Sequence, residues 1–372
     1  MKYTSPAPRL LKAIQAAAAL APGTGKRFQI ESTLLTVTDV GALEVQATDM
    51  ADSFWFRVDP VPNTPFTPGK LFLGSANLSR AIKEAGKADV TIETVGDYGA
   101  LISWGTTKVK LPAEMVEDAP PVKRFNPADP TVQLPASGLI ALLKRVNFAT
   151  STDFKNRSMA FVRIEVKPKG LRLGATDGAR IASVEIDLDK DAAYVSTAYV
   201  MPIKPARIKL LVDGDDKVTI KLRVTPEIIT LVTDSAEMTV RTGHAQWPDF
   251  DIDKQLTNAK AVTIPTADMK KLLNGADLLK VKGETTCEFK LTANALEMDA
   301  IATVEGAVNS QIPVEWKYDP FTIRLDPSFL WDAVNACDAD QVELSFDTNQ
   351  QPAKLREAEG NRLYLYALGA RH

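Results

Sequence analysis

The segment LEVQATDMADSFWFRVD, which spans Leu43–Asp59, occurs in three related forms along this chain of 372 residues. The second form is LRLGATDGARIASVEID (Leu171–Asp187), and the third is LEMDAIATVEGAVNSQIPVE (Leu296–Glu315). Their first residues, at positions 43, 171 and 296, are 128 and 125 residues apart. A nearly constant spacing of this size indicates copies of a whole domain rather than of a short motif.

Two further sets of residues follow the same spacing. Each copy has a proline after a short β-like stretch and a valine that opens a later one: Pro6, Pro135 and Pro265, and Val90, Val218 and Val342. Since roughly 100–200 residues form one domain, the copies predict three domains, 1–126, 127–254 and 255–372. The stretch Asp118–Pro130 is rich in proline and aspartate, which is typical of a linker.

Each copy has the same predicted order of elements: a short strand, a helix, several strands, a second helix and more strands. In the first copy, strands are expected over Leu34–Thr38, Leu43–Ala47 and Phe54–Val58. The six predicted helices are Pro8–Leu20, Ser75–Gly86, Ser137–Phe148, Ile203–Val212, Thr266–Leu279 and Pro327–Ala336. Because the helices are segregated from the strands rather than alternating with them as βαβ units, the fold class is α+β with antiparallel sheets.

The predicted helices differ in charge from the rest of the chain. The formal net charge of the chain is −3, yet five of the six helices carry a net positive charge. For any single helix, a solvated face is the simpler interpretation. If the five share one surface, it is a basic stripe that attracts phosphates without reading base sequence. The sixth helix is an acidic exception, with Asp326, Asp332, Asp338 and Asp340 in or beside it.

Several classes of protein are excluded or disfavoured. The longest apolar stretch near the start, Ala16–Ala21, is far shorter than the roughly 18 residues that cross a bilayer. No signal-peptide pattern is present, and the two cysteines, Cys287 and Cys337, suit buried or free thiols in a reducing cytoplasm. No cofactor or metal site is expected, because no metal-ligand spacing occurs.

A catalytic constellation is also not expected. The two histidines, His244 and the terminal His372, have no suggested nucleophile beside them. Asp49 and Asp177 occupy equivalent positions in the repeat, which favours turn capping at strand ends over an acid–base pair. The string before Lys26 suggests a phosphate loop, but that motif requires Gly where Leu20 stands and Ser or Thr where Arg27 stands.

Three short motifs carry a resemblance to a known family. MKYT (Met1–Thr4), ATDGARIA (Ala175–Ala182) and WPDF (Trp247–Phe250), together with the repeat, resemble the bacterial DNA sliding clamp, the beta subunit of DNA polymerase III. The resemblance implies three repeated clamp domains, each with two inner helices and two outer antiparallel sheets, in a crescent that dimerises head to tail into a ring. The sequence departs from the family at Ala179, where histidine is usual, and in the tail Ala367–His372.

The resemblance also implies partners and the residues that meet them. The partners are double-stranded DNA bound without sequence preference, a clamp loader, replicative and repair polymerases bound through short linear peptides, and a second copy of the chain. DNA contacts are expected at Lys12, Lys26, Arg27, Arg80, Lys83, Lys144, Arg145, Lys204 and Arg207. The peptide pocket is expected at Met159, Thr176, Gly178, Arg180, Ile181, Pro248, Phe329, Tyr366, Ala367 and Leu368. The dimer interface is expected at Val109, Leu111, Leu278 and Leu279.

Three functions therefore remain open from the sequence. The first is a processivity factor for DNA replication. The second is an interaction scaffold of the same fold, or a specialised phage or paralogous clamp, without a general replication role. The third is a hydrolase that uses Asp49 or Asp177, which the missing nucleophile–base set disfavours.

Overall fold

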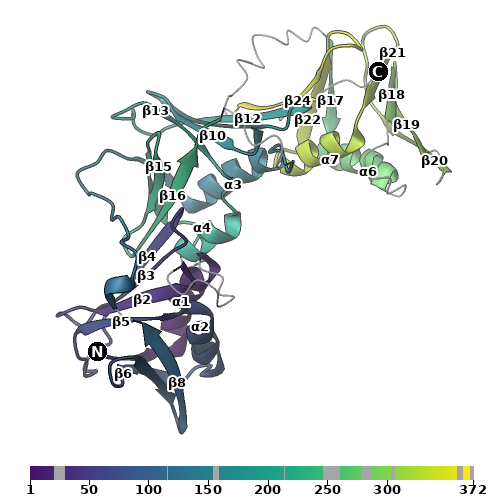
Figure 1. Ribbon diagram of the computed structural model, residues 1–372. Coiled ribbons are helices and arrows are strands. Elements are labelled where there is room, and N and C mark those ends of the chain that lie inside the picture. Colours follow the sequence, from purple (N-terminus) through teal and green to yellow (C-terminus); the bar gives the residue numbers. More distant parts are fainter. Residues whose placement is uncertain are drawn as a thin grey trace. The chain divides into compact units, whose positions relative to one another are not determined.

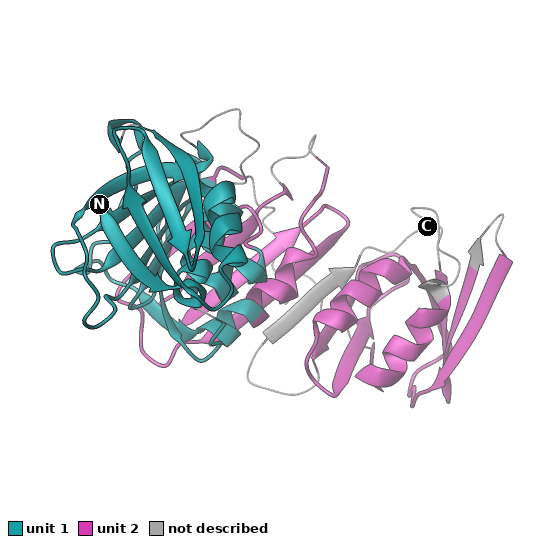
Figure 2. Ribbon diagram, turned by 90° about the horizontal axis from the view of Figure 1, so that it is seen from below, with its two compact units in different colours: residues 1–140, 204–242 teal, residues 141–203, 243–372 magenta. Residues whose placement is uncertain are grey.

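The computed structural model describes residues 1–20, 30–114, 116–153, 159–212, 214–245, 260–277, 287–302, 306–357 and 363–368, the last range by its backbone. The chain forms two compact units, residues 1–140 with 204–242 and residues 141–203 with 243–372 (Figure 2). The second repeat is divided between the two units. The three domain boundaries expected from the sequence therefore stay a prediction.

Eight strands and two helices recur in each third of the described chain (Figure 1). The first third contains β1 (Lys2–Pro6), α1 (Ala7–Leu20), β2 (Ser32–Val37), β3 (Leu43–Thr48), β4 (Ser53–Val58), β5 (Gly69–Gly74), α2 (Ser75–Glu84), β6 (Asp89–Thr94), β7 (Gly99–Trp104), β8 (Thr107–Glu114) and the short 3₁₀ helix η2 (Val116–Asp118).

The other two thirds repeat this order. The second contains β9 (Val132–Pro135), α3 (Ala136–Asn147), β10 (Val162–Val166), β11 (Gly170–Thr176), β12 (Arg180–Asp187), β13 (Ser196–Val200), α4 (Pro205–Leu211), β14 (Thr219–Val224), β15 (Ile228–Val232) and β16 (Ala236–Gly243). The third contains β17 (Lys260–Pro265), α6 (Thr266–Asp277), β18 (Cys287–Thr292), β19 (Ala295–Ala302), β20 (Gly306–Pro313), β21 (Phe321–Leu325), α7 (Pro327–Ala336), β22 (Gln341–Phe346), β23 (Ala353–Glu357) and β24 (Leu363–Leu368).

Every strand pairing in the first unit is antiparallel. The strands run in the order β1, β6, β7, β8, β5, β2, β3, β4, β16, β15, β14 and β9. The pairing of β4 with β16 joins the first repeat to the second, and we call it the first seam. Helix α1 packs beside α2 and against β3 and β4, where Leu10 and Ile14 are fully buried.

The second unit has the same antiparallel character. One sheet runs β13, β10, β11, β12, β24, β23, β22 and β17, and another runs β20, β19, β18 and β21. The pairing of β12 with β24 joins the second repeat to the third, and we call it the second seam. Helices α6 and α7 pack against each other, and α6 also lies against β20.

The predicted α+β class is confirmed, and most predicted elements lie within two residues of their observed bounds. Pro6, Pro135 and Pro265 each end the strand that precedes the first helix of a repeat. A proline suits that position because it has no N–H to donate and the next element is a helix. No helix in the described ranges is long and apolar enough to cross a membrane.

Candidate functional site

The turn between β11 and β12 holds the ATDG motif in a fixed geometry. The Asp177 carboxylate accepts hydrogen bonds from the backbone N–H groups of Ala179 and Arg180, both at 3.0 Å. Thr176 Oγ1 accepts from Gly178 N at 3.1 Å and donates to the Arg180 carbonyl at 2.8 Å. Gly178 has φ +91°, a conformation that side chains with a Cβ rarely adopt. The turn-capping role predicted for Asp177 is confirmed.

Arg180 links this turn to helix α7. Its Nε donates to Asp177 Oδ2 at 2.9 Å, and its Nη1 donates to Asp332 Oδ2 at 2.7 Å. Its Nη2 donates to the Phe148 carbonyl at 2.8 Å, and the guanidinium carbon lies 4.5 Å from the centre of the Phe329 ring. The side chain is only 11% exposed, so its charge is directed to these protein partners.

The residues predicted for the peptide pocket come together in the second unit. At the second seam, Leu368 lies opposite Arg180 and Ala367 lies opposite Ile181. A Cβ on Gly178 would lie 3.2 Å from the sulfur of Met159, which places that methionine beside the turn. Segments distant in the sequence therefore meet at one place. Pro248 lies outside the described residues, and Tyr366, Ala367 and Leu368 are described by their backbone alone.

The first seam contains the same turn. The Asp49 carboxylate accepts from the N–H groups of Ala51 and Asp52 at 2.9 and 2.7 Å, so its predicted capping role is also confirmed. Arg207 on α4 donates to Asp52 Oδ2 at 2.8 Å, and the backbone N–H of Arg241 donates to Asp52 Oδ1 at 3.3 Å. Burial raises the pKa of Asp52, and the hydrogen bond from Arg207 opposes that shift.

Apart from Arg145, the side chains predicted to contact DNA fall into three groups. Five are exposed on or beside helices: Lys12, Arg80, Lys83, Lys144 and Lys204. Lys26 and Arg27 lie outside the described residues. Arg207 is one-third exposed and held by Asp52, which leaves it less available than the exposed group.

Arg145 corrects the prediction of a phosphate contact at that position. Its side chain is 5% exposed, and its Nη2 donates to Asp338 Oδ2 at 2.8 Å and to Glu357 Oε1 at 3.3 Å. Successive helical residues point about 100° apart, so the neighbour Lys144 faces solvent while Arg145 faces the protein. Arg145 therefore forms ion pairs with carboxylates of the third repeat.

The acidic sixth helix, left as an exception by the sequence, now has a physical explanation. Asp332 pairs with Arg180, and Asp338 pairs with Arg145, so two of its aspartates hold arginines of the second repeat. Asp326 caps α7 by accepting the N–H of Ser328 at 2.9 Å. Sequence reasoning missed Asp332 and Asp338 as site residues, although the reversed charge of this helix was the available signal.

For the dimer interface, Val109 and Leu111 lie half-buried on β8, whereas Leu278 and Leu279 lie outside the described residues. The sequence also missed strand β20, one of the two outer strands of its four-stranded sheet.

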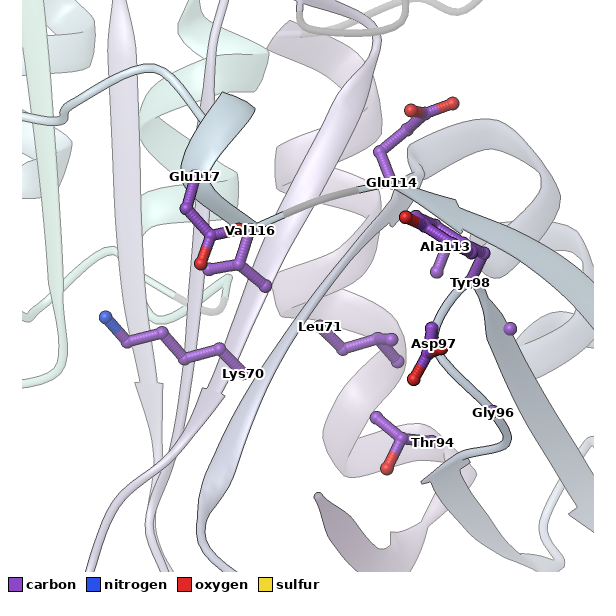
Figure 3. A pocket seen from close by; sticks show the side chains of 11 residues that line it. Lys70, Leu71, Thr94, Gly96, Asp97, Tyr98, Ala113, Glu114, Val116 and Glu117 are labelled. Atoms are coloured by element: carbon purple, nitrogen blue, oxygen red, sulfur yellow. The ribbon is translucent and has the colours of Figure 1, made fainter.

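No catalytic arrangement is found in the described part of the chain. A pocket of about 360 Å³ opens in the first repeat between β5, the β6–β7 turn and η2. Lys70 and Glu117 lie on one side of it and Asp97 and Tyr98 on the other (Figure 3), without a histidine or cysteine in its described lining. The described residues contain no cluster of three or more metal-ligating side chains. Burial raises the pKa of the Cys287 thiol to about 12, so it is not a thiolate nucleophile near neutral pH.

Comparison with known proteins identifies the family. Residues 133–249 and 256–368 match the models of the central and C-terminal domains of the DNA polymerase III beta subunit. The chain is 25% identical over 284 residues to the beta sliding clamp of Synechococcus elongatus, covering 72% of each protein. It is 22% identical over 299 residues to that of Bacillus subtilis, covering 78% of this chain and 77% of the relative.

Solved structures show the same fold. The DNA polymerase III subunit beta from Pseudomonas aeruginosa superposes with a TM-score of 0.90 at 19% identity, covering all of both chains. The sliding clamp from Bacillus subtilis superposes with a TM-score of 0.89 at 17% identity, covering 100% of this chain and 99% of that one. Since the two domain models together match more than half of the residues, the chain belongs to the DNA polymerase III beta subunit family.

Proposed function

We propose that this protein is a DNA polymerase processivity factor, a sliding clamp in which two copies close into a ring around double-stranded DNA. The names of its relatives support this proposal, and one structural pattern carries it. At the first seam, the fourth strand of repeat one (β4) pairs with the last strand of repeat two (β16). At the second seam, the fourth strand of repeat two (β12) pairs with the last strand of repeat three (β24).

The same rule leaves two strands without their counterpart. They are β20, the fourth strand of repeat three, and β8, the last strand of repeat one. Residues 107–112 of β8 pair only with β7 in the described chain, and β20 pairs only with β19. Both strands alternate exposed and half-buried residues in the same order, whereas β4 buries four of its six residues and β12 three of its eight.

Pairing β8 of one copy with β20 of another, twice, closes a two-membered ring and leaves no free edge at either strand. In this arrangement Val109 and Leu111 face the interface from β8, and Leu278 and Leu279, which follow α6, are proposed to meet them. Two chains of three repeats then give a ring of six similar repeats.

The exposed cations Lys12, Arg80, Lys83, Lys144 and Lys204 support DNA binding that is weak, blind to base sequence and sensitive to salt. Lys26 and Arg27 stay in the proposed set, and Arg145 leaves it. The ring itself is proposed to be non-catalytic and to act in the cytoplasm.

The cluster around the second-seam turn is proposed as the site for short linear peptides of polymerases and of a clamp loader. Gly178 supplies backbone to this surface, and Ile181 and Phe329 supply half-buried apolar side chains. Arg180 is fixed within it by hydrogen bonds to Asp177 and Asp332. Large apolar side chains buried there would each contribute about 1.5–3 kcal/mol. A fixed site of this kind suits successive partners that share a peptide motif.

The decisive experiment compares retention on circular and linear DNA. The protein is loaded on a nicked circle, the free protein is removed, and half of the sample is cut once with a restriction enzyme. A topological ring stays on the circle and leaves the linear molecule. The control is the double variant Val109→Glu and Leu111→Glu, which should be monomeric and should not be retained on either DNA.

Two results would contradict the proposal. One is equal retention on circular and linear DNA, which indicates ordinary electrostatic binding and favours a scaffold or a specialised paralogue. The other is a wild-type protein that sediments as a monomer at micromolar concentration.

A further inference from the structure

The stretch Asp118–Pro130, which we call the connecting segment, links the first repeat to the second. It contacts both strands of the first seam through one side chain. Trp55 on β4 and Glu237 on β16 lie directly opposite each other across that seam. Arg124, from the connecting segment, places its guanidinium carbon 3.5 Å from the centre of the Trp55 ring. The same guanidinium donates through Nε and Nη2 to the two carboxylate oxygens of Glu237, at 2.9 and 2.8 Å.

One guanidinium makes the ring contact and both bonds to the carboxylate. Glu237 is 11% exposed and Trp55 is 7% exposed, whereas the Arg124 side chain is 40% exposed, so Arg124 covers two largely buried partners from the solvent side. Glu237 also accepts the backbone N–H of Phe125 at 3.0 Å, which fixes the main chain of the connecting segment as well as the Arg124 side chain. A two-point Arg–carboxylate bond fixes orientation, which a single lysine bond does not.

The connecting segment is held at a second place. Arg223 on β14 donates through Nη1 to the Pro130 carbonyl at 3.1 Å. Between these anchors, the segment cannot leave the sheet without losing the Arg124 contacts. The equivalent facing pair at the second seam is Ser183 and Leu365, which offers neither an aromatic ring nor a carboxylate for such a contact.

We propose that Arg124 is a latch on the first seam: β4 and β16 separate only after the guanidinium leaves Trp55 and Glu237. The connecting segment then has a mechanical role besides linking two repeats, because it keeps the first seam closed while the chain is strained elsewhere. This inference concerns the seam alone and does not depend on DNA binding.

The test is hydrogen–deuterium exchange of the full-length protein, read by mass spectrometry on peptides that cover β4, β16, β12 and β24. Arg124→Ala should speed exchange of the β4 and β16 amides by at least about tenfold, because their protection reports local opening. Exchange in β12 and β24 should stay unchanged. Lys123→Ala is the matched control, since Lys123 is an exposed neighbour, and it should alter neither seam.

Arg124→Lys keeps the charge and should still speed exchange at the first seam, though less than Arg124→Ala does. Glu237→Gln should act like Arg124→Ala, and the double variant should be no faster than either single one, because both remove the same latch. The proposal is overturned if Arg124→Ala leaves β4 and β16 protected, if it loosens both seams equally, or if the two single effects add.

Discussion

The two seams contain a turn with the same hydrogen bonds, but the last residue of that turn has the opposite charge in each. Each has a five-residue turn with the same hydrogen bonds, followed by a strand that pairs with the next repeat. At the first seam the turn ends in Asp52, which meets Arg207; at the second it ends in Arg180, which meets Asp332. Arg207 is the third residue of α4, and the third residue of α7 is the aromatic Phe329.

The middle residue of the turn differs in the same sense. The first turn has Met50 at φ +74°, with 65% of its surface exposed. The second has Gly178, which lets Met159 approach closely. The same backbone arrangement therefore carries different side chains at the two seams. This difference supports our proposal that the peptide site lies at the second seam alone.

Breaking the second seam should have the largest effect. Arg180→Ala leaves Asp332 and Asp177 without their shared partner and removes a cation from the Phe329 ring. We expect the free energy of unfolding to fall by about 3 kcal/mol, since removing one partner of a largely buried pair leaves the other unpaired. Urea denaturation measures this, and a loss below that of Arg207→Ala would contradict the ranking of the seams.

The peptide site gives the next largest effect. Ile181→Asp should weaken binding of a peptide ending in a Leu-Phe-like pair by at least tenfold, about 1.4 kcal/mol. Ser53→Asp, at the equivalent position of the first seam, is the matched control and should leave affinity unchanged. Fluorescence anisotropy of a labelled peptide measures both. If the two variants lose affinity equally, the second seam is not the peptide site.

The first seam should respond to pH. Burial already raises the pKa of Asp52, so the folded state favours the protonated acid, and this group's contribution to stability decreases as pH rises above its unfolded pKa of about 3.9. Arg207→Ala removes the group that opposes the shift. We expect a loss of about 1 kcal/mol at pH 7 and a smaller loss at pH 4. Thermal melting at both values checks this, and a larger loss at pH 4 would reverse the predicted sign.

Exchanging the middle residues should have the smallest effects. Met50→Gly should stabilise the protein by about 0.5 kcal/mol or more, because glycine adopts a positive φ without strain and the exposed methionine side chain loses little packing. Gly178→Met should destabilise it, since its Cβ would approach Met159 Sδ. Differential scanning calorimetry compares the two, and changes of the same sign would show that φ is not the cause.

The sequence determined the repeat, the α+β class and the helix positions, because proline columns and apolar periodicity are local and recur three times. It also placed Asp49 and Asp177 in turns, since an aspartate caps the backbone beside it. The residues proposed for the peptide site come from the resemblance to a family. Their meeting depends on β12 pairing with β24, a contact that no local pattern encodes.

Only the tertiary structure decided which charges are available. Lys144 and Arg145 are equal in the sequence, yet the first faces solvent and the second is buried against Asp338 and Glu357. That β8 and β20 lack the partner which the other repeats give to the equivalent strands likewise became visible only from the pairings of β4 with β16 and of β12 with β24. The physical reason is the same in both cases: burial and pairing depend on residues more than a hundred positions away, and a linear pattern specifies what a residue is but not what it contacts.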